Sequence, residues 1–229
     1  MQLILIPGLI CTDALWAPQS TALSDVAEVT VADHRRHDAI ADIAASLLQS
    51  APPRFALAGL SMGGYVALEV MRQAPRRVTK LALLDTSARA DSPAKQAERR
   101  ALIDQAGMGR FRGVSDRLLP LFVHPERLQD KALTDVIYRM AEETGRDGFI
   151  RQQRAILSRP DYRAGLAAIA VPSLVLCGRQ DRLTPLDLHE EMAAAIPDAD
   201  LEIVETCGHL STLERPDEVN QAMRRWLTT

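Results

Sequence analysis

Short, continuous apolar runs alternate along most of this chain with segments in which apolar residues recur every three to four positions. The first pattern is typical of strands that are buried on both faces of a sheet, and the second is typical of helices. Strands that alternate with helices need crossover connections, which make the sheet parallel and put helices on both of its faces. The sequence therefore predicts an α/β fold with a doubly wound, mostly parallel, six-stranded sheet. The expected strands span residues 2–6, 27–33, 54–59, 80–85, 172–178 and 200–205, and the expected helices between them span 37–50, 62–74, 186–196 and 216–227.

One long interval, residues 86–165, breaks this alternation. It contains no convincing strand, and helical periodicity runs through it from end to end. The interval is too long for a single crossover between two strands of one sheet. We therefore expect a helical subdomain, residues 86–165, inserted into a core that residues 1–85 and 166–229 form together. Its helical segments span 92–107, 112–123, 127–144 and 145–158.

Ser61 stands where the third expected strand meets the following helix, within Gly-Leu-Ser-Met-Gly. A serine at such a junction lies on a sharp turn that crowds its neighbours, which favours glycine at Gly59 and Gly63. Its hydroxyl is a poor nucleophile without a base. Of the five histidines, only His209 lies in a glycine-containing loop just after an expected strand, at the sheet edge where chemistry is usually found. The other four are expected to be solvated: His34, His37, His124 and His189.

A histidine base needs an acid that fixes its tautomer and stabilises the imidazolium ion. Asp181 follows the fifth expected strand, so its side chain is expected at the same sheet edge. Alone, it would be read as an exposed turn residue. Three such residues at three strand ends, in the order Ser61, Asp181, His209, favour a catalytic triad instead.

In three separate blocks, GLSMGG, VPSLVLCGRQDRLTP and CGHLSTLERPDEV, the sequence resembles the α/β-hydrolase family, in particular the small esterases with a four-helix cap. The resemblance covers essentially the whole chain. It implies Ser61 as nucleophile, His209 as base and Asp181 as orienting acid, on a sheet ordered 2-1-3-4-5-6. Some relatives take the acid from the position of Asp85, but the match around Asp181 is fuller.

The resemblance also implies an oxyanion hole made by the backbone N–H groups of Met62 and Leu9. The chain departs from the family in two places. Pro7 precedes Gly8 where many relatives carry histidine, and the first apolar run begins at once, without the family's leading antiparallel hairpin. A backbone donor at Leu9 survives the first exchange.

The resemblance implies a serine hydrolase that cleaves carboxylic esters through an acyl-enzyme, with esters of methanol or other small alcohols favoured and no cofactor or metal. Ser61 excludes relatives that use an aspartate nucleophile. Hydrolysis of thioesters, lactones or C–C bonds, peracid formation, and a non-catalytic small-molecule receptor stay open as alternatives. Two glycine motifs are typical of nucleotide-binding proteins, G-x-G-x-x-G and G-x-x-x-x-G-K-(S/T). Neither follows the first strand, which excludes a plain nucleotide-binding protein.

The composition limits which classes of partner the protein can bind and what its pocket can contain. The net charge of -3 gives no support to nucleic-acid binding, and no apolar run is long enough for a membrane span. Three cysteines without a CxxC pair indicate reduced, buried thiols, which fits a cytoplasmic protein. We expect it to be a monomer or a homodimer. Aromatic residues make up only 4% of the chain, which favours an aliphatic pocket. Besides Leu9 and Met62, the candidates for its walls are Ile10, Trp16, Phe111, Phe122, Leu183 and Leu210.

The inserted segment has the opposite charge to the rest of the chain. It holds 15 basic and 11 acidic side chains, and so carries +4 while the remainder carries -7. One interpretation is a solvated outer face of helices. The other is a basic cap that receives a substrate ending in a carboxylate, or an acidic carrier protein that presents one.

Overall fold

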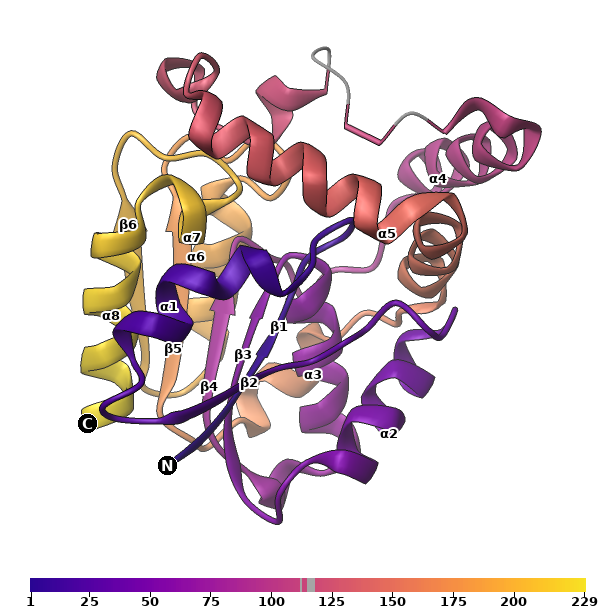
Figure 1. Cartoon of the computed structure of the whole chain (residues 1–229). Helices are drawn as coiled ribbons and strands as arrows, with labels where there is room; N and C mark the ends of the chain where they lie inside the picture. The colour runs from indigo at the N-terminus through magenta and orange to yellow at the C-terminus, as the bar shows by residue number, and fades with distance from the viewer. Residues whose placement is uncertain (112, 115–117) are drawn as a thin grey trace.

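The sheet of the computed structural model, which describes residues 1–111, 113–114 and 118–229, confirms the predicted topology (Figure 1). All neighbouring strands pair in parallel, in the order β2-β1-β3-β4-β5-β6. This order brings the carboxyl ends of strands that are distant in sequence to one edge. The strands are β1 (Gln2–Ile6), β2 (Glu28–Val31), β3 (Phe55–Leu60), β4 (Val78–Leu84), β5 (Ser173–Gly178) and β6 (Ala199–Val204).

Helices cover both faces of the sheet, which explains the continuous apolar runs. In β1, Leu3 and Leu5 pack into the core on one face, and Ile4 and Ile6 pack into the core on the other, as the two-residue period of a strand requires. Helix α8 and the segment around α1 complete the first core, while α2, α3 and α6 complete the second. These helices are α1 (Ala17–Ala22), α2 (Ile40–Ser50), α3 (Met62–Gln73), α6 (Leu186–Ala195) and α8 (Pro216–Thr228).

The expectation that every strand is buried on both faces is wrong for β2 and β6. Along both strands, exposed or half-buried residues replace the full burial seen in β3 and β5. Both are edge strands of the sheet, with a neighbour on one side only. The sequence analysis also missed the short helix α1 and the 3-10 turn before it (Asp13–Trp16), which are too short to give a clear helical period.

The inserted segment is helical, as expected, but its helices differ in extent. Helix α4 (Pro93–Gln105) is followed by a π-helical turn (Ala106–Arg110), and α5 (Lys131–Ser158) joins two expected helices across a kink at Gly145, where φ is +65°. Of the helix expected over 112–123, only the 3-10 turn Leu119–Leu121 is present among the described residues; positions 112 and 115–117 lie outside them. In Figure 1, α4 and α5 lie beyond the carboxyl ends of the strands.

The remaining helical elements are short connections. None of the helices in the described part of the chain is long and apolar enough to cross a membrane. The short elements are Pro75–Arg77, Pro125–Arg127, Arg163–Ala168 and α7 (Ser211–Glu214).

Candidate active site

Ser61 occupies the turn between β3 and α3 in a strained backbone conformation, with φ +55° and ψ -116°. Residues other than glycine rarely adopt a positive φ, and such strain is concentrated at functional sites. The turn needs its glycines for steric reasons. A Cβ on Gly59 would lie 2.2 Å from the Gly63 carbonyl oxygen, and a Cβ on Gly63 would lie 2.1 Å from the Ile6 carbonyl oxygen. Glycine is therefore required at both positions, because a larger residue would collide with the neighbouring backbone.

The structure brings the three residues of the predicted triad together. The His209 Nε2 atom lies 2.9 Å from Ser61 Oγ, and the His209 Nδ1 atom lies 2.8 Å from Asp181 Oδ2. The carboxylate can only accept a hydrogen bond, so Nδ1 carries the proton and Nε2 is left to accept the Ser61 O–H. Ser61 comes from the end of β3, Asp181 from the end of β5 and His209 from the loop after β6.

The hydrogen bonds around Asp181 keep it ionised. Its Oδ1 atom accepts from the Leu183 and Thr184 N–H groups at 2.8 and 3.0 Å, and its Oδ2 atom accepts from the Thr184 hydroxyl at 2.6 Å. Burial by itself raises the pKa of Asp181, but the charge on His209 and these hydrogen bonds outweigh it and hold that pKa below its usual value. Burial likewise lowers the pKa of His209, and the Asp181 carboxylate overcomes this and raises it. The pair thus favours a basic Nε2 atom beside the serine.

Both residues expected to supply oxyanion donors lie beside the serine turn. Met62 is the first residue of α3, where a backbone N–H has no acceptor within the helix. Gly8 packs against the turn, since a Cβ added to it would lie 3.4 Å from Ser61 Cβ, and Leu9 is the next residue. Two backbone N–H groups from separate elements are thereby brought to one end of the sheet.

Comparison with known protein families identifies the family of this chain. Residues 3–222 match the model described as "Alpha/beta hydrolase family". The chain belongs to the alpha/beta hydrolase family. A protein of Serratia proteamaculans provisionally named carbamate hydrolase RutD is 28% identical to this hydrolase, over 98% of this chain and 90% of its own. The pimeloyl-[acyl-carrier protein] methyl ester esterase of Aliivibrio salmonicida is 26% identical, over 98% of this chain and 91% of its own.

The fold of this hydrolase is also similar to that of a solved enzyme. A thermophilic esterase from Thermogutta terrifontis, determined with malate bound, superimposes with a TM-score of 0.90 at 26% sequence identity. The superposition covers 100% of this chain and 89% of that one.

Asp85, the alternative acid, directly follows β4 and is hydrogen-bonded to residues other than the histidine. Its Oδ1 atom accepts the Gly178 N–H at 2.9 Å, and its Oδ2 atom is hydrogen-bonded to the Ser211 hydroxyl. Burial and the nearby charge of Asp181 raise the pKa of Asp85 to about 8, so the carboxyl is protonated at neutral pH. Of the two carboxyl groups, Asp181 is the one that is hydrogen-bonded to the ring of His209.

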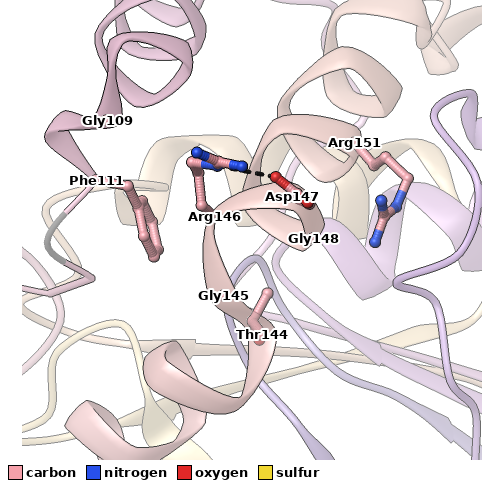
Figure 2. A pocket seen from close by; sticks show the side chains of 8 residues that line it. All are labelled: Gly109, Phe111, Thr144, Gly145, Arg146, Asp147, Gly148 and Arg151. Atoms are coloured by element: carbon pink, nitrogen blue, oxygen red, sulfur yellow. Dashed lines mark hydrogen bonds and ion pairs between the residues drawn. The ribbon is translucent and has the colours of Figure 1, made fainter.

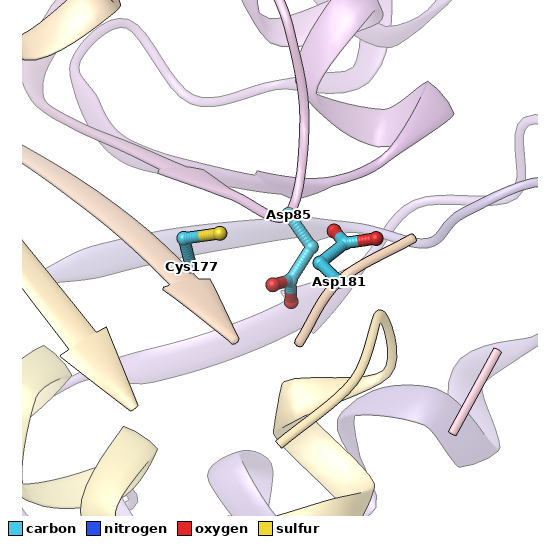
Figure 3. Close-up of side chains that lie close together, drawn as sticks. All are labelled: Asp85, Cys177 and Asp181. Carbon is cyan, nitrogen blue, oxygen red and sulfur yellow. The ribbon is translucent and has the colours of Figure 1, made fainter. Parts of the chain in front are cut away.

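Asp85, Asp181 and Cys177 form a cluster that the sequence analysis did not anticipate, with potential ligand atoms within 4.8 Å of one another (Figure 3). Their chemistry does not fit a resident metal ion. The oxygens of both carboxyl groups already have hydrogen-bond partners in the protein. Burial raises the pKa of the Cys177 thiol well above its usual range, so the sulfur keeps its proton.

Two of the four histidines expected to be solvated are buried. His189 accepts the Thr86 N–H on Nε2 at 2.8 Å, and burial lowers its pKa to about 4. His34 is 1% exposed, and burial lowers its pKa to about 4 as well. The expectation is wrong for these two because each ring has a backbone partner in the core, which local sequence does not reveal. His37 and His124 keep part of their surface exposed.

The His209 loop is tied to the inserted segment by contacts that the sequence analysis missed. The Phe122 carbonyl oxygen accepts the His209 N–H at 3.0 Å. The buried Glu214 carboxylate accepts the Gly208 N–H at 2.9 Å and the His124 N–H at 2.6 Å. Phe122, expected to line the pocket, thus also holds the loop through its backbone. No local pattern singles out Glu214, because its link to the inserted segment is with His124, 90 positions away.

The other candidates for the pocket walls lie in different surroundings. Trp16 is fully buried, Leu210 is 2% exposed and Ile10 is 7% exposed, and all three pack in one core cluster. Leu183 is half-buried beside Asp181, to which its N–H donates. Trp16 and Leu210 are therefore core side chains.

Phe111 lies at a separate depression of about 410 Å³ on the inserted segment (Figure 2). Its ring packs against Phe149 with the ring centroids 5.1 Å apart. Arg146 and Arg151 also line the depression, and none of the three triad residues does.

Proposed function

We propose that this hydrolase cleaves carboxylic esters through an acyl-enzyme on Ser61, with His209 as base and Asp181 as orienting acid. The contact of 2.9 Å between Ser61 Oγ and His209 Nε2, with Asp181 on the far side of the ring, is the observation that carries the proposal. A hydroxyl paired with an oriented imidazole is what nucleophilic attack on a carbonyl needs.

In the proposed mechanism, His209 takes the Ser61 proton while Oγ attacks the ester carbonyl. The backbone N–H groups of Leu9 and Met62 stabilise the oxyanion, and His209 then gives the proton to the departing alcohol. Water, activated by the same imidazole, cleaves the acyl-enzyme and releases the acid. Asp181 stays ionised throughout and stabilises the imidazolium ion that forms in each half of the reaction.

The names of the relatives support ester substrates in general and do not identify one. Two of the three proteins compared above are named as esterases, and the third name refers to a carbamate, whose carbonyl a serine can attack in the same way. We infer that the inserted segment covers the site as a cap. All three cysteines are buried and unpaired, which supports the reducing cytoplasm as the place of action.

Turnover of p-nitrophenyl acetate and p-nitrophenyl butyrate, together with labelling by a fluorophosphonate, tests the proposal. We expect turnover and one covalent adduct, both lost in Ser61→Ala because the nucleophilic oxygen is gone. Triad members act as a unit, so His209→Ala should lose a similar factor, about 10³ or more. A receptor would bind the ester without turnover, and either variant keeping more than about a tenth of wild-type kcat would contradict the triad. A panel of esters that varies acyl length and alcohol size then defines the substrate.

A further inference from the structure

The turn that follows β1 is strained at one position and packed beside the nucleophile. The Cys11 N–H donates to the Gly8 carbonyl oxygen at 3.2 Å, which closes a turn over residues 8–11. Within it Ile10 has φ +54°, a conformation that β-branched residues adopt only when their surroundings impose it. Something outside the turn must therefore hold it in this shape.

Two buried side chains hold this turn, and neither belongs to the triad. Gln152, from the second half of α5, accepts the Ile10 N–H on Oε1 at 2.9 Å. The His34 Nε2 atom, from the segment after β2, lies 3.0 Å from the Gly8 carbonyl oxygen. Both side chains are at most 1% exposed, so water does not replace these partners. Figure 1 shows the loop after β1 running up to α5, where these contacts form.

The contact of His34 bears directly on the donor next to it. The Gly8 carbonyl and the Leu9 N–H belong to one planar peptide unit, in which C=O and N–H point in opposite directions. A partner that fixes the Gly8 oxygen therefore fixes the direction of the Leu9 N–H. A hydrogen bond to the carbonyl also polarises the unit, which strengthens its N–H as a donor.

The His34 Nε2 atom has two neighbours and can serve only one of them. It lies 3.0 Å from the Gly8 carbonyl oxygen, and it also lies 3.0 Å from the amide nitrogen of Gln152, whose oxygen accepts the Ile10 N–H. A neutral imidazole has one N–H. With that proton on Nε2, the ring donates to Gly8; with it on Nδ1, Nε2 accepts from Gln152 instead. Only the first tautomer holds the peptide unit of Gly8 and Leu9.

We propose that His34 and Gln152 are positioning residues, which hold the two peptide units on either side of Leu9 and so aim its N–H at the developing oxyanion. The proposal rests on the proposed ester hydrolysis. Gln152 lies on α5, within the inserted segment. The direction of the Leu9 N–H, and with it the rate of the chemical step, therefore depends on where that segment is placed.

Four variants test the proposal in the p-nitrophenyl acetate assay. His34→Leu removes the donor, while His34→Gln can restore it, since the glutamine amide nitrogen reaches about as far as Nε2. Gln152→Met keeps the size of the side chain and removes the acceptor. Gln153→Met is the matched control: Gln153 is its neighbour on α5 and is equally buried, but it accepts from Arg99 at 2.8 Å instead of from the turn.

Loss of one oxyanion donor costs about 10²–10³ in kcat, and a misdirected donor should cost less. We expect kcat to fall about 10- to 100-fold in His34→Leu and about 10-fold in Gln152→Met, with KM unchanged. His34→Gln and Gln153→Met should stay within about threefold of the wild type. The inhibition constant of a phenylboronic acid, whose adduct with Ser61 places an oxygen in the oxyanion hole, should rise in parallel with the loss of kcat.

Thermal unfolding of each variant separates positioning from stability. A loss of kcat that follows the fall in Tm across all four variants, without rescue by His34→Gln, would overturn the proposal. So would wild-type kcat in both His34→Leu and Gln152→Met. If His34→Leu does not fold, the pair Gln152→Met and Gln153→Met decides alone. Ser61→Ala is measured in the same assay: turnover without the serine contradicts the proposed function, whereas intact turnover in the bracing variants contradicts only this inference.

Discussion

The carboxyl groups of Asp85 and Asp181 meet at the ends of β4 and β5, with oxygens within 4.8 Å of each other and neither residue more than 4% exposed (Figure 3). Two carboxylates this close and this deeply buried cannot both carry a charge. Asp181 is hydrogen-bonded to His209, whose charge helps to hold the pKa of Asp181 below its usual value. Asp85 is the member of the pair that holds a proton.

This division predicts different effects of the same substitution at the two sites. Asp181→Asn puts an amide against Nδ1 of His209 and favours the wrong tautomer, for which a loss of about 10⁴ in kcat is expected. Asp85→Asn leaves an uncharged group of the same size, which can still accept from Gly178, so kcat should change by less than about tenfold. Steady-state kinetics on p-nitrophenyl acetate compare the two. A larger loss in Asp85→Asn would give Asp85 the role of the acid.

The proton on Asp85 also predicts how stability depends on pH. The pKa of this carboxyl is about 8 in the folded protein, against 3.8 for an ordinary aspartate. Between these values the folded protein holds a proton that the unfolded chain has released, so this part of the stability is lost as pH rises through about 8. Asp85→Asn has no such proton. Its unfolding free energy, relative to the wild type, should therefore increase when urea unfolding is repeated from about pH 5 to about pH 8.

Asp91 offers a control of opposite sign. Burial raises the pKa of this carboxyl, but Arg99 and Arg159, at 2.6 and 2.9 Å, outweigh burial and hold it below the usual value. Its contribution to stability is present above the unfolded pKa and is lost as pH falls. Asp91→Asn should thus be most destabilising at neutral pH and progressively less so in acid. The prediction for Asp85 fails if both variants respond to pH in the same direction.

We expect the pKa of His209, the proposed base, to determine how the rate falls on the acid side of the pH–rate profile. Burial lowers the pKa of His209, but Asp181 overcomes this and raises it above its usual value. Because only the neutral imidazole can accept the Ser61 proton, kcat/KM should fall as pH is lowered through that raised pKa. In Asp181→Asn the raising charge is gone, so the residual activity should titrate at lower pH. An acid limb at the same pH in both proteins would show that another group controls the rate.

The sequence predicted those features that short segments decide. The glycines around Ser61 are fixed by backbone approach within one strand–helix turn, so local spacing identifies them. Strand order followed from the family resemblance. The choice between Asp85 and Asp181 as the acid was less certain, because both follow a strand at the same edge of the sheet. The contacts of Thr184 and His209 with Asp181 make the distinction, and these contacts form only in three dimensions.

The bracing of the oxyanion turn could not be predicted for a related reason. His34 lies among charged residues in ADHRRHD, which is typical of a solvated loop, and yet it is buried. Its partner Gln152 is 118 positions away on a helix of mixed composition. Burial of a polar side chain depends on which distant groups satisfy its hydrogen bonds, and no local pattern carries that information.

Charge on the inserted segment leads to the last prediction. The segment carries +4 overall, but several of its arginines already form ion pairs, among them Arg99 and Arg159 with Asp91, and Arg146 with Asp147 at 2.9 Å. If the net positive charge steers an anionic ester to the site, kcat/KM for a monomethyl dicarboxylate ester should fall as salt shortens the Debye length from ~10 Å at 0.1 M to ~3 Å at 1 M. The neutral ester of the same chain length is the control, and its kcat/KM should change little. Arg151, which lines the depression in Figure 2, is the side chain whose replacement by alanine should reduce that difference. Equal salt responses for the two esters would mean that the arginines only solvate and pair at the surface of the helices.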